Sequence, residues 1–144
     1  PKTNSFSYYV GKWNGSALVH TDAVQKYLLS DDLSPAEIGY TFADEADMIN
    51  VALFGKKAKE WREENPEAHK RGENIRDYAS AEELIILVNM ESQNAELIKA
   101  GLSQKERYIK LRDMAKTQMQ VLLKNRTKET LKNVNPNLLK GTNE

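Results

Sequence analysis

Glu91 is the residue of this sequence whose position most suggests chemistry. At 100° per residue it falls inside the apolar stripe of a predicted helix over residues 81–100, rather than beside that stripe. The stripe consists of Leu84, Leu87, Val88, Ala95 and Ile98. A carboxylate in such surroundings either has a raised pKa or lies against an opposite charge. Glu91 is therefore a candidate general acid or ligand, or else the buried partner of an arginine such as Arg76 or Arg112.

The structural interpretation of Glu91 is favoured, because a single acid without a convergent second acid, His or Cys is weak support for catalysis. Asn89 and Asn94 flank Glu91 in the sequence and could extend the same polar network. We therefore expect Glu91, Asn89, Asn94 and Arg76 to be buried structural polar residues. No catalytic residue is predicted.

A second acidic group, Asp44, Glu45 and Asp47, could form a site for a hard metal ion together with His20 and Asp22. Carboxylates at the start of a helix also face the positive end of its dipole, which is a sufficient reason for their position. We therefore predict no metal site. A small metal- and acid-dependent hydrolase or nuclease, using Glu91 with these three acids, remains the alternative.

Composition excludes several other kinds of site. The 144 residues include no Cys and only two His, which excludes disulfides and thiolate zinc sites. Serine-protease-like triads, glycine-rich phosphate loops and dinucleotide fingerprints are absent as well. We expect no cofactor and no enzymatic activity.

The segment 56–62 is basic and could be a DNA-recognition helix, but glutamates at 60, 63 and 64 interrupt its charge. We favour a solvated helix face anchored in the core by Trp61.

Capping signals predict where the helices begin. Ser34, Ser80 and Ser103 each precede a glutamate by three residues, which is the capping-box pattern. These signals predict helices over 34–54, 81–100 and 103–125, with Gly55 and Gly101 placed to end the first two. A shorter helix is predicted over 58–64. The last two helices are joined by so short a link that they should form a long antiparallel hairpin.

Residues 6–19 are the one stretch whose pattern resembles strand. Aromatic and β-branched residues flank Asn14-Gly15, a dipeptide typical of a type I′ hairpin turn. The expected fold is thus mainly α: a helical bundle that ends in a helical hairpin, with a short N-terminal β-hairpin. Residues 1–126 should form a single domain, and 127–144 a flexible tail.

Apolar residues of the last helix cover an arc of about 200°, wider than one neighbouring helix covers. A second copy of the chain, or an N-terminal part of the protein outside this chain, could bury the rest, and core helices of the same domain are the other possibility. The candidate interface residues are Tyr108, Met114, Met119 and Leu122, with Tyr9 and Trp13 of the hairpin.

The net charge is zero, yet charges are segregated along the chain. Residues 1–55 carry three Lys/Arg against seven acids, whereas 99–132 carry ten against three. The basic segment could contact nucleic acid, or it could dock on the acidic segment within the fold or across a dimer. The zero total favours the second interpretation.

No apolar run approaches the ~20 residues needed to span a bilayer, and no leader pattern is present. We expect a cytoplasmic protein that contacts no membrane. The chain begins at Pro1 without an initiator Met, which suggests a fragment of a longer protein.

Several segments resemble the region downstream of the DNA-binding module in bacterial KilA-N domain proteins. They are residues 19–24, 43–55, 58–66, 74–79, 94–98 and 101–107, in this order and spacing. The resemblance implies a phage- or mobile-element-related protein whose N-terminal domain, outside this chain, binds DNA. It assigns no catalytic residue here and implies a role in assembly or in contact with a partner protein.

Overall fold

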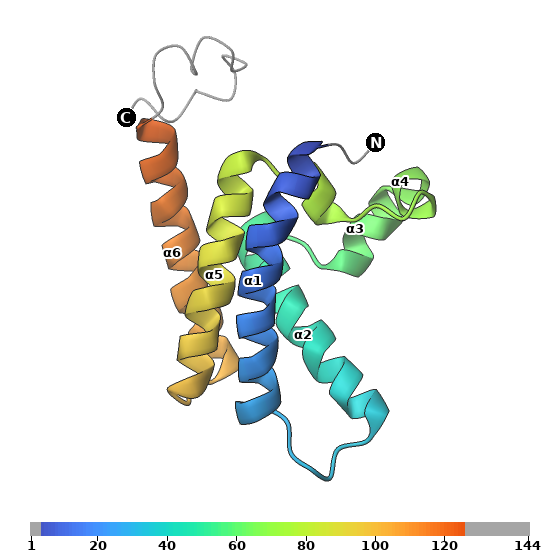
Figure 1. Ribbon diagram of the computed structural model, residues 1–144, viewed down its shortest axis with the longest axis vertical. Coiled ribbons are helices and arrows are strands. Elements are labelled where there is room, and N and C mark those ends of the chain that lie inside the picture. Colours follow the sequence, from blue (N-terminus) through green and yellow to red (C-terminus); the bar gives the residue numbers. More distant parts are fainter. Residues whose placement is uncertain (1–3, 126–144) are drawn as a thin grey trace.

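The computed structural model describes residues 4–125, and the side chains from residue 15 onward. It is mainly α, which confirms the expected fold class (Figure 1). The elements in chain order are α1 (Asn4–Tyr27), α2 (Pro35–Phe54), α3 (Ala58–Glu64), α4 (Pro66–Lys70), the 3₁₀ helix η1 (Ile75–Tyr78), α5 (Ala81–Lys99) and α6 (Gln104–Lys124). The expected tail over 127–144 lies outside the described residues.

Helix α5 is the centre of the molecule and lies between α1 and α6, with α2 also packed against it (Figure 1). Its side chains Ile86, Leu87 and Met90 are fully buried. They form the main core with apolar residues of α2 and α6, among them Ile49 and Leu111. A second cluster joins α1 to α5 through side chains such as Val24 and Ile98. The three other long helices, α1, α2 and α6, therefore meet around α5, and polar side chains that point inward from all four must find partners there.

The predicted β-hairpin over 6–19 is wrong, because these residues lie in the helix α1. Ser16, His20, Ala23 and Val24 are buried at spacings of three and four residues, which is the periodicity of a helix face. Gly15 costs a helix only ~1 kcal/mol relative to alanine, and the packing of α1 on α5 outweighs that cost.

The predicted capping boxes are confirmed. Ser34, Ser80 and Ser103 each accept a hydrogen bond from the backbone N–H of the glutamate three residues later, and that glutamate bonds back to the serine N–H. The glycine predicted to end α2 is Gly55, which adopts the left-handed conformation (φ 81°) that glycine tolerates best. These local signals lie at the starts of α2, α5 and α6 and at the end of α2.

Helices α3 and α4 and η1 form a small lobe beside the bundle (Figure 1). Trp61, Ala68 and Ile75 are buried together there, with Phe54 at the end of α2 packed against them. Trp61 is thus the buried anchor expected for the basic segment 56–62. Among the described helices, none is long and apolar enough to cross a membrane.

Candidate functional site

Arg107 is the centre of a buried polar cluster that draws on all four long helices. We call it the Arg107 cluster, and its members are His20 of α1, Glu45 of α2, Asn94 of α5, and Gln104 and Arg107 of α6. Four of the five are buried, with exposures of 8% or less, and Gln104 lies at the edge. Each helix therefore contributes a polar group that only the other helices can satisfy.

The Arg107 guanidinium makes a two-pronged contact with the Glu45 carboxylate. Nη1 donates to Oε1 at 2.6 Å, and Nη2 donates to Oε2 at 3.1 Å. Nη1 also donates to Oδ1 of Asn94 (3.0 Å), and Nε donates to the backbone carbonyl of Leu102 (3.2 Å). This paired geometry is the arrangement in which a buried charge pair is best compensated.

The amide of Asn94 links His20 to this pair. Its Nδ2 donates to Oε1 of Glu45 (3.2 Å) and lies 2.8 Å from Nε2 of His20. Because the amide nitrogen is a donor, Nε2 of His20 must accept, which requires a neutral ring with its proton on Nδ1. Burial, opposed by Glu45, lowers the pKa of His20 and agrees with this neutral state.

Burial alone would raise the pKa of Glu45. The hydrogen bonds from Arg107, Gln104 and Asn94 outweigh burial and hold the pKa of the Glu45 carboxyl below its usual value. Glu45 is therefore a charged, fully bonded carboxylate, and no acceptor lone pair faces an open space where a substrate could bind.

Glu91 belongs to a second group, the Glu91 cluster, with Ser16 of α1, Asn50 of α2 and Arg76 of η1. Ser16 Oγ donates to Oε1 of Glu91 at 2.7 Å, and Nη1 of Arg76 lies 3.4 Å from Oε2. Arg76 also donates to Oδ1 of Asn50 through Nε and Nη2. Glu91 is 3% exposed and lies beside one of the two arginines that the sequence suggested.

Burial raises the pKa of Glu91, because one hydroxyl and a long contact to Arg76 compensate its charge only in part. The pKa of Arg76 is lowered, again chiefly by burial. Arg112, the other suggested partner, instead donates to the backbone carbonyl of Ala52. The cluster fastens η1, and with it the small lobe, to α2 and α5.

The structure separates the asparagines that flank Glu91. Asn94 is fully buried but belongs to the Arg107 cluster, one turn farther along α5. Asn89 is exposed and bonds to Gln118 of α6, so the prediction that it is buried is wrong. Two residues along a helix are 200° apart, which turns Asn89 away from the side that Glu91 faces.

The acids of the hydrolase alternative do not converge on one point. Glu91 and Glu45 are held in the two different clusters, each already bonded to an arginine. Asp44 and Asp47 instead line a groove at the surface. Among the described residues, no group of three or more His, Asp or Glu side chains is arranged to hold a metal ion.

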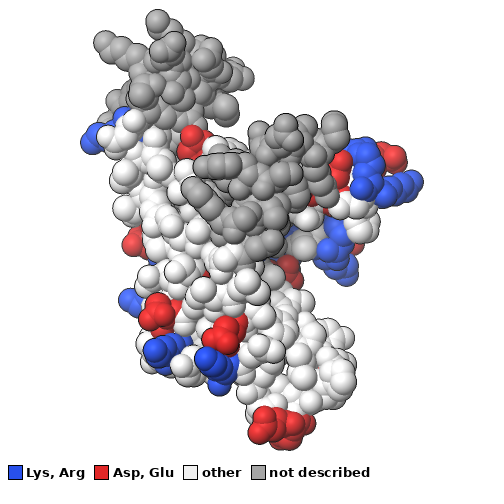
Figure 2. All heavy atoms as spheres, viewed as in Figure 1, with Lys and Arg blue, Asp and Glu red and all other residues white. Residues whose placement is uncertain are grey.

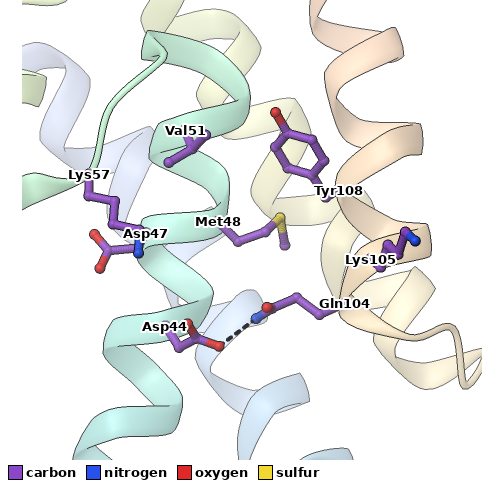
Figure 3. A pocket seen from close by; sticks show the side chains of 8 residues that line it. All are labelled: Asp44, Asp47, Met48, Val51, Lys57, Gln104, Lys105 and Tyr108. Carbon is purple, nitrogen blue, oxygen red and sulfur yellow. Dashed lines mark hydrogen bonds between the residues drawn. The ribbon is translucent and has the colours of Figure 1, made fainter.

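The groove between α2 and α6 has a volume of about 330 Å³ (Figure 3). Its lining is Asp44, Asp47, Met48 and Val51 of α2, Lys57 at the start of α3, and Gln104, Lys105 and Tyr108 of α6. Asp44 accepts a hydrogen bond from Gln104 (2.8 Å), and Asp47 accepts one from the backbone N–H of Ala58 (3.2 Å). The groove therefore combines two carboxylates and two ammonium groups with an apolar floor.

The predicted interface residues of α6 lie partly within the core. Tyr108, Met114, Met119 and Leu122 are half-buried and pack against the main cluster of α2, α5 and α6. Two neighbouring helices, α5 and α2, pack against the wide apolar arc of α6, and Val121 at its C-terminal end stays 52% exposed. The side chains of Tyr9 and Trp13 lie outside the described part of the structure.

Sequence reasoning missed the Arg107 cluster. Arg107, Leu111 and Ala115 repeat at intervals of four residues, and all three are buried. A charge within that stripe was the same signal that identified Glu91 on α5. The partners of Arg107 could not be named from the sequence. Glu45 is 62 residues from Arg107, and His20 is 74 residues from Asn94, on helices whose arrangement the sequence did not reveal.

Acidic and basic side chains alternate over the surface shown in Figure 2, and they gather at its lower edge and on α3 and α4. The upper part of α6 on this face is largely uncharged. No continuous basic surface is visible among the described residues that this view leaves uncovered.

Comparison of the chain with protein-family models, with curated proteins and with solved structures found no match.

Proposed function

We propose that this chain is a protein-interaction and oligomerisation domain of a KilA-N-type DNA-binding regulator. The resemblance of the segments between residues 19 and 107 suggests the kind of regulator. The observation that carries the interaction role is the exposure of two large apolar side chains beside the α2–α6 groove: Tyr40 is 76% exposed and Ile109 is 57% exposed.

Tyr40 lies one helical turn before Asp44 on α2, and Ile109 lies one turn after Lys105 on α6. Residues four apart share a helix face, so these two side chains flank the groove. Its floor of Met48, Val51 and Tyr108 continues the apolar surface between them. Contiguous apolar surface with a polar rim is typical of protein-interaction sites.

The placement of the acids favours this role over the hydrolase alternative. A catalytic carboxylate needs a partner group and access to substrate. Glu45 and Glu91 are each 3% exposed and bonded to other side chains, which suits a structural role for both.

Sedimentation equilibrium over a range of protein concentrations tests the proposal. We expect self-association that weakens when Tyr40→Ser and Ile109→Ser are combined, because both side chains leave water on association. Leu18→Ser is the matched control, since Leu18 is 70% exposed on α1, away from the groove lining. A strict monomer at all concentrations would contradict the oligomerisation role.

A further inference from the structure

We infer that a second copy of this chain docks on the α2–α6 groove across a twofold axis, so that the aspartates of each copy meet the lysines of the other. The inference rests on the proposed oligomerisation role and specifies the surface that performs it. Three observations carry it: unpaired charges, their self-complementary arrangement, and the apolar surface around them.

The groove's four charged side chains form no ion pair with one another or with any other described residue. They are Asp44, Asp47, Lys57 and Lys105. Four such groups beside one apolar floor are therefore available to a partner.

The charges are arranged so that the surface complements itself. Asp44 and Asp47 project from α2, while Lys57 and Lys105 lie at the start of α3 and on α6 (Figure 3). In a twofold contact the same surface is used on both copies, and a residue that meets its opposite in one direction does so in the other. Two aspartates against two lysines then give two equivalent sets of opposite-charge contacts.

A partner of one charge sign fits the groove less well. A polyanion such as nucleic acid would be attracted by the two lysines but repelled by the two aspartates beside them. A basic peptide would be attracted by the two aspartates but repelled by the two lysines. The balance of charge therefore selects a partner with both signs, which a second copy carries by necessity.

The apolar side chains around the charges supply contact area. Tyr40, Met48 and Val51 follow one another along about 17 Å of α2. Tyr108 lines the groove from α6, and the next residue, Ile109, is exposed beside it. Stable interfaces combine such an apolar centre with charges that fix the register.

The test is charge reversal, measured as the dimer dissociation constant by sedimentation equilibrium. Asp44→Lys gives the groove a net charge of about +2, and Lys105→Glu gives it about −2. Each variant alone should dissociate about tenfold more readily or worse, because like charges now face each other. Mixing the two variants, or combining both changes in one chain, should restore association. The wild-type dimer should also weaken with added salt.

The matched control reverses two exposed charges away from the groove, Glu96→Lys and Lys116→Glu, and should leave the constant unchanged. Circular dichroism of each variant checks folding, and Asp44→Asn replaces Asp44→Lys if the latter unfolds. If the wild type forms a dimer and both single groove variants have the same dissociation constant as the wild type, this inference is overturned and the oligomerisation role still stands. A double variant as weak as either single one also overturns it. A monomeric wild type defeats the role itself.

Discussion

Glu45 and Glu91 are equally buried, at 3% exposure each, but their neighbours stabilise the ionised carboxylate to different extents. Glu45 receives two hydrogen bonds from Arg107 and others from Asn94 and Gln104, and its pKa is lowered despite burial. For Glu91, burial prevails over Ser16 and Arg76, and the pKa is raised. The charge of Glu45 therefore stabilises the fold, whereas that of Glu91 is only partly compensated.

The variants Glu45→Gln and Glu91→Gln should differ in cost. Removing the charge of Glu45 leaves Arg107 buried without its counter-ion, and we expect a loss of about 3–5 kcal/mol in the free energy of unfolding. Glu91→Gln resembles the protonated acid and should cost about 1–2 kcal/mol. Urea denaturation measures both, with Glu63→Gln at an exposed site as the control. A larger loss for Glu91→Gln would contradict this account of the two sites.

His20 should make stability depend on pH. Its pKa in the folded chain lies below the usual value of 6.5, so between the two values the unfolded chain binds one more proton. The free energy of unfolding should therefore fall as the pH drops from 6.5 into that window. Glu45 adds a further loss at lower pH, as it becomes protonated below its usual value of 4.5. Glu91 acts in the opposite sense. Because its pKa is raised in the folded chain, its contribution to the free energy of unfolding decreases as the pH rises above 4.5.

The contribution of His20 can be measured from the denaturation midpoints of the wild type and of two histidine variants between pH 5 and pH 8. His20→Gln should flatten the pH dependence below 6.5, whereas His69→Gln should leave it intact, because His69 is exposed and serves as the matched control. Equal slopes for His20→Gln and the wild type would show that His20 is not responsible.

At the scale of elements, Gly15→Ala distinguishes the helix α1 from the hairpin that the sequence suggested. Gly15 is in mid-helix, and a Cβ added there meets no atom within 4 Å. Alanine should therefore stabilise the chain by about 0.5–1 kcal/mol. In a type I′ turn the same glycine would have positive φ, and alanine would destabilise it.

The matched control is Gly101→Ala, which also has open space but adopts φ 87°, so alanine there should destabilise. Thermal unfolding of the two variants should thus shift in opposite directions. A destabilised Gly15→Ala would support the hairpin instead.

Helices α2, α5 and α6 could be predicted because their signals are local. A capping serine with its glutamate begins each of these helices, and a glycine follows the last turn of α2 and of α5. Helix α1 could not be predicted in this way, because its buried face consists largely of Ser16, His20 and Ala23 rather than large apolar residues. The long-range contact with α5 decides its structure, and Asn14-Gly15 is only a weak local preference against it.

The two polar clusters could likewise be predicted only where the signal lies within one helix. The burial of Glu91 and a nearby arginine follow from one helix's periodicity, since a charge inside an apolar stripe requires compensation. The choice of Arg76 over Arg112, and the meeting of His20, Glu45, Asn94 and Arg107, depend on which helices are neighbours. That information lies in the whole arrangement and in no single segment.

At the scale of the whole molecule, the isolated chain should bind duplex DNA weakly. Its formal net charge is zero, and acidic groups accompany the basic ones on the face shown in Figure 2. Nonspecific binding depends on several unopposed cations that displace counterions from phosphates. Fluorescence anisotropy with a labelled duplex should show no tight binding at physiological salt. Tight binding with a steep salt dependence would reassign the basic segment 99–132 to nucleic acid.

Because the Arg107 cluster takes one or more members from each long helix, it cannot form in stages. An intermediate that lacks α2 or α6 leaves Arg107 or Glu45 without its counter-ion, and one that lacks α1 or α5 leaves a buried polar side chain without one of its hydrogen-bond partners. Such intermediates are disfavoured, so the bundle should melt in one concerted step, and trimming a helix from either end should cost the cooperativity of the remainder.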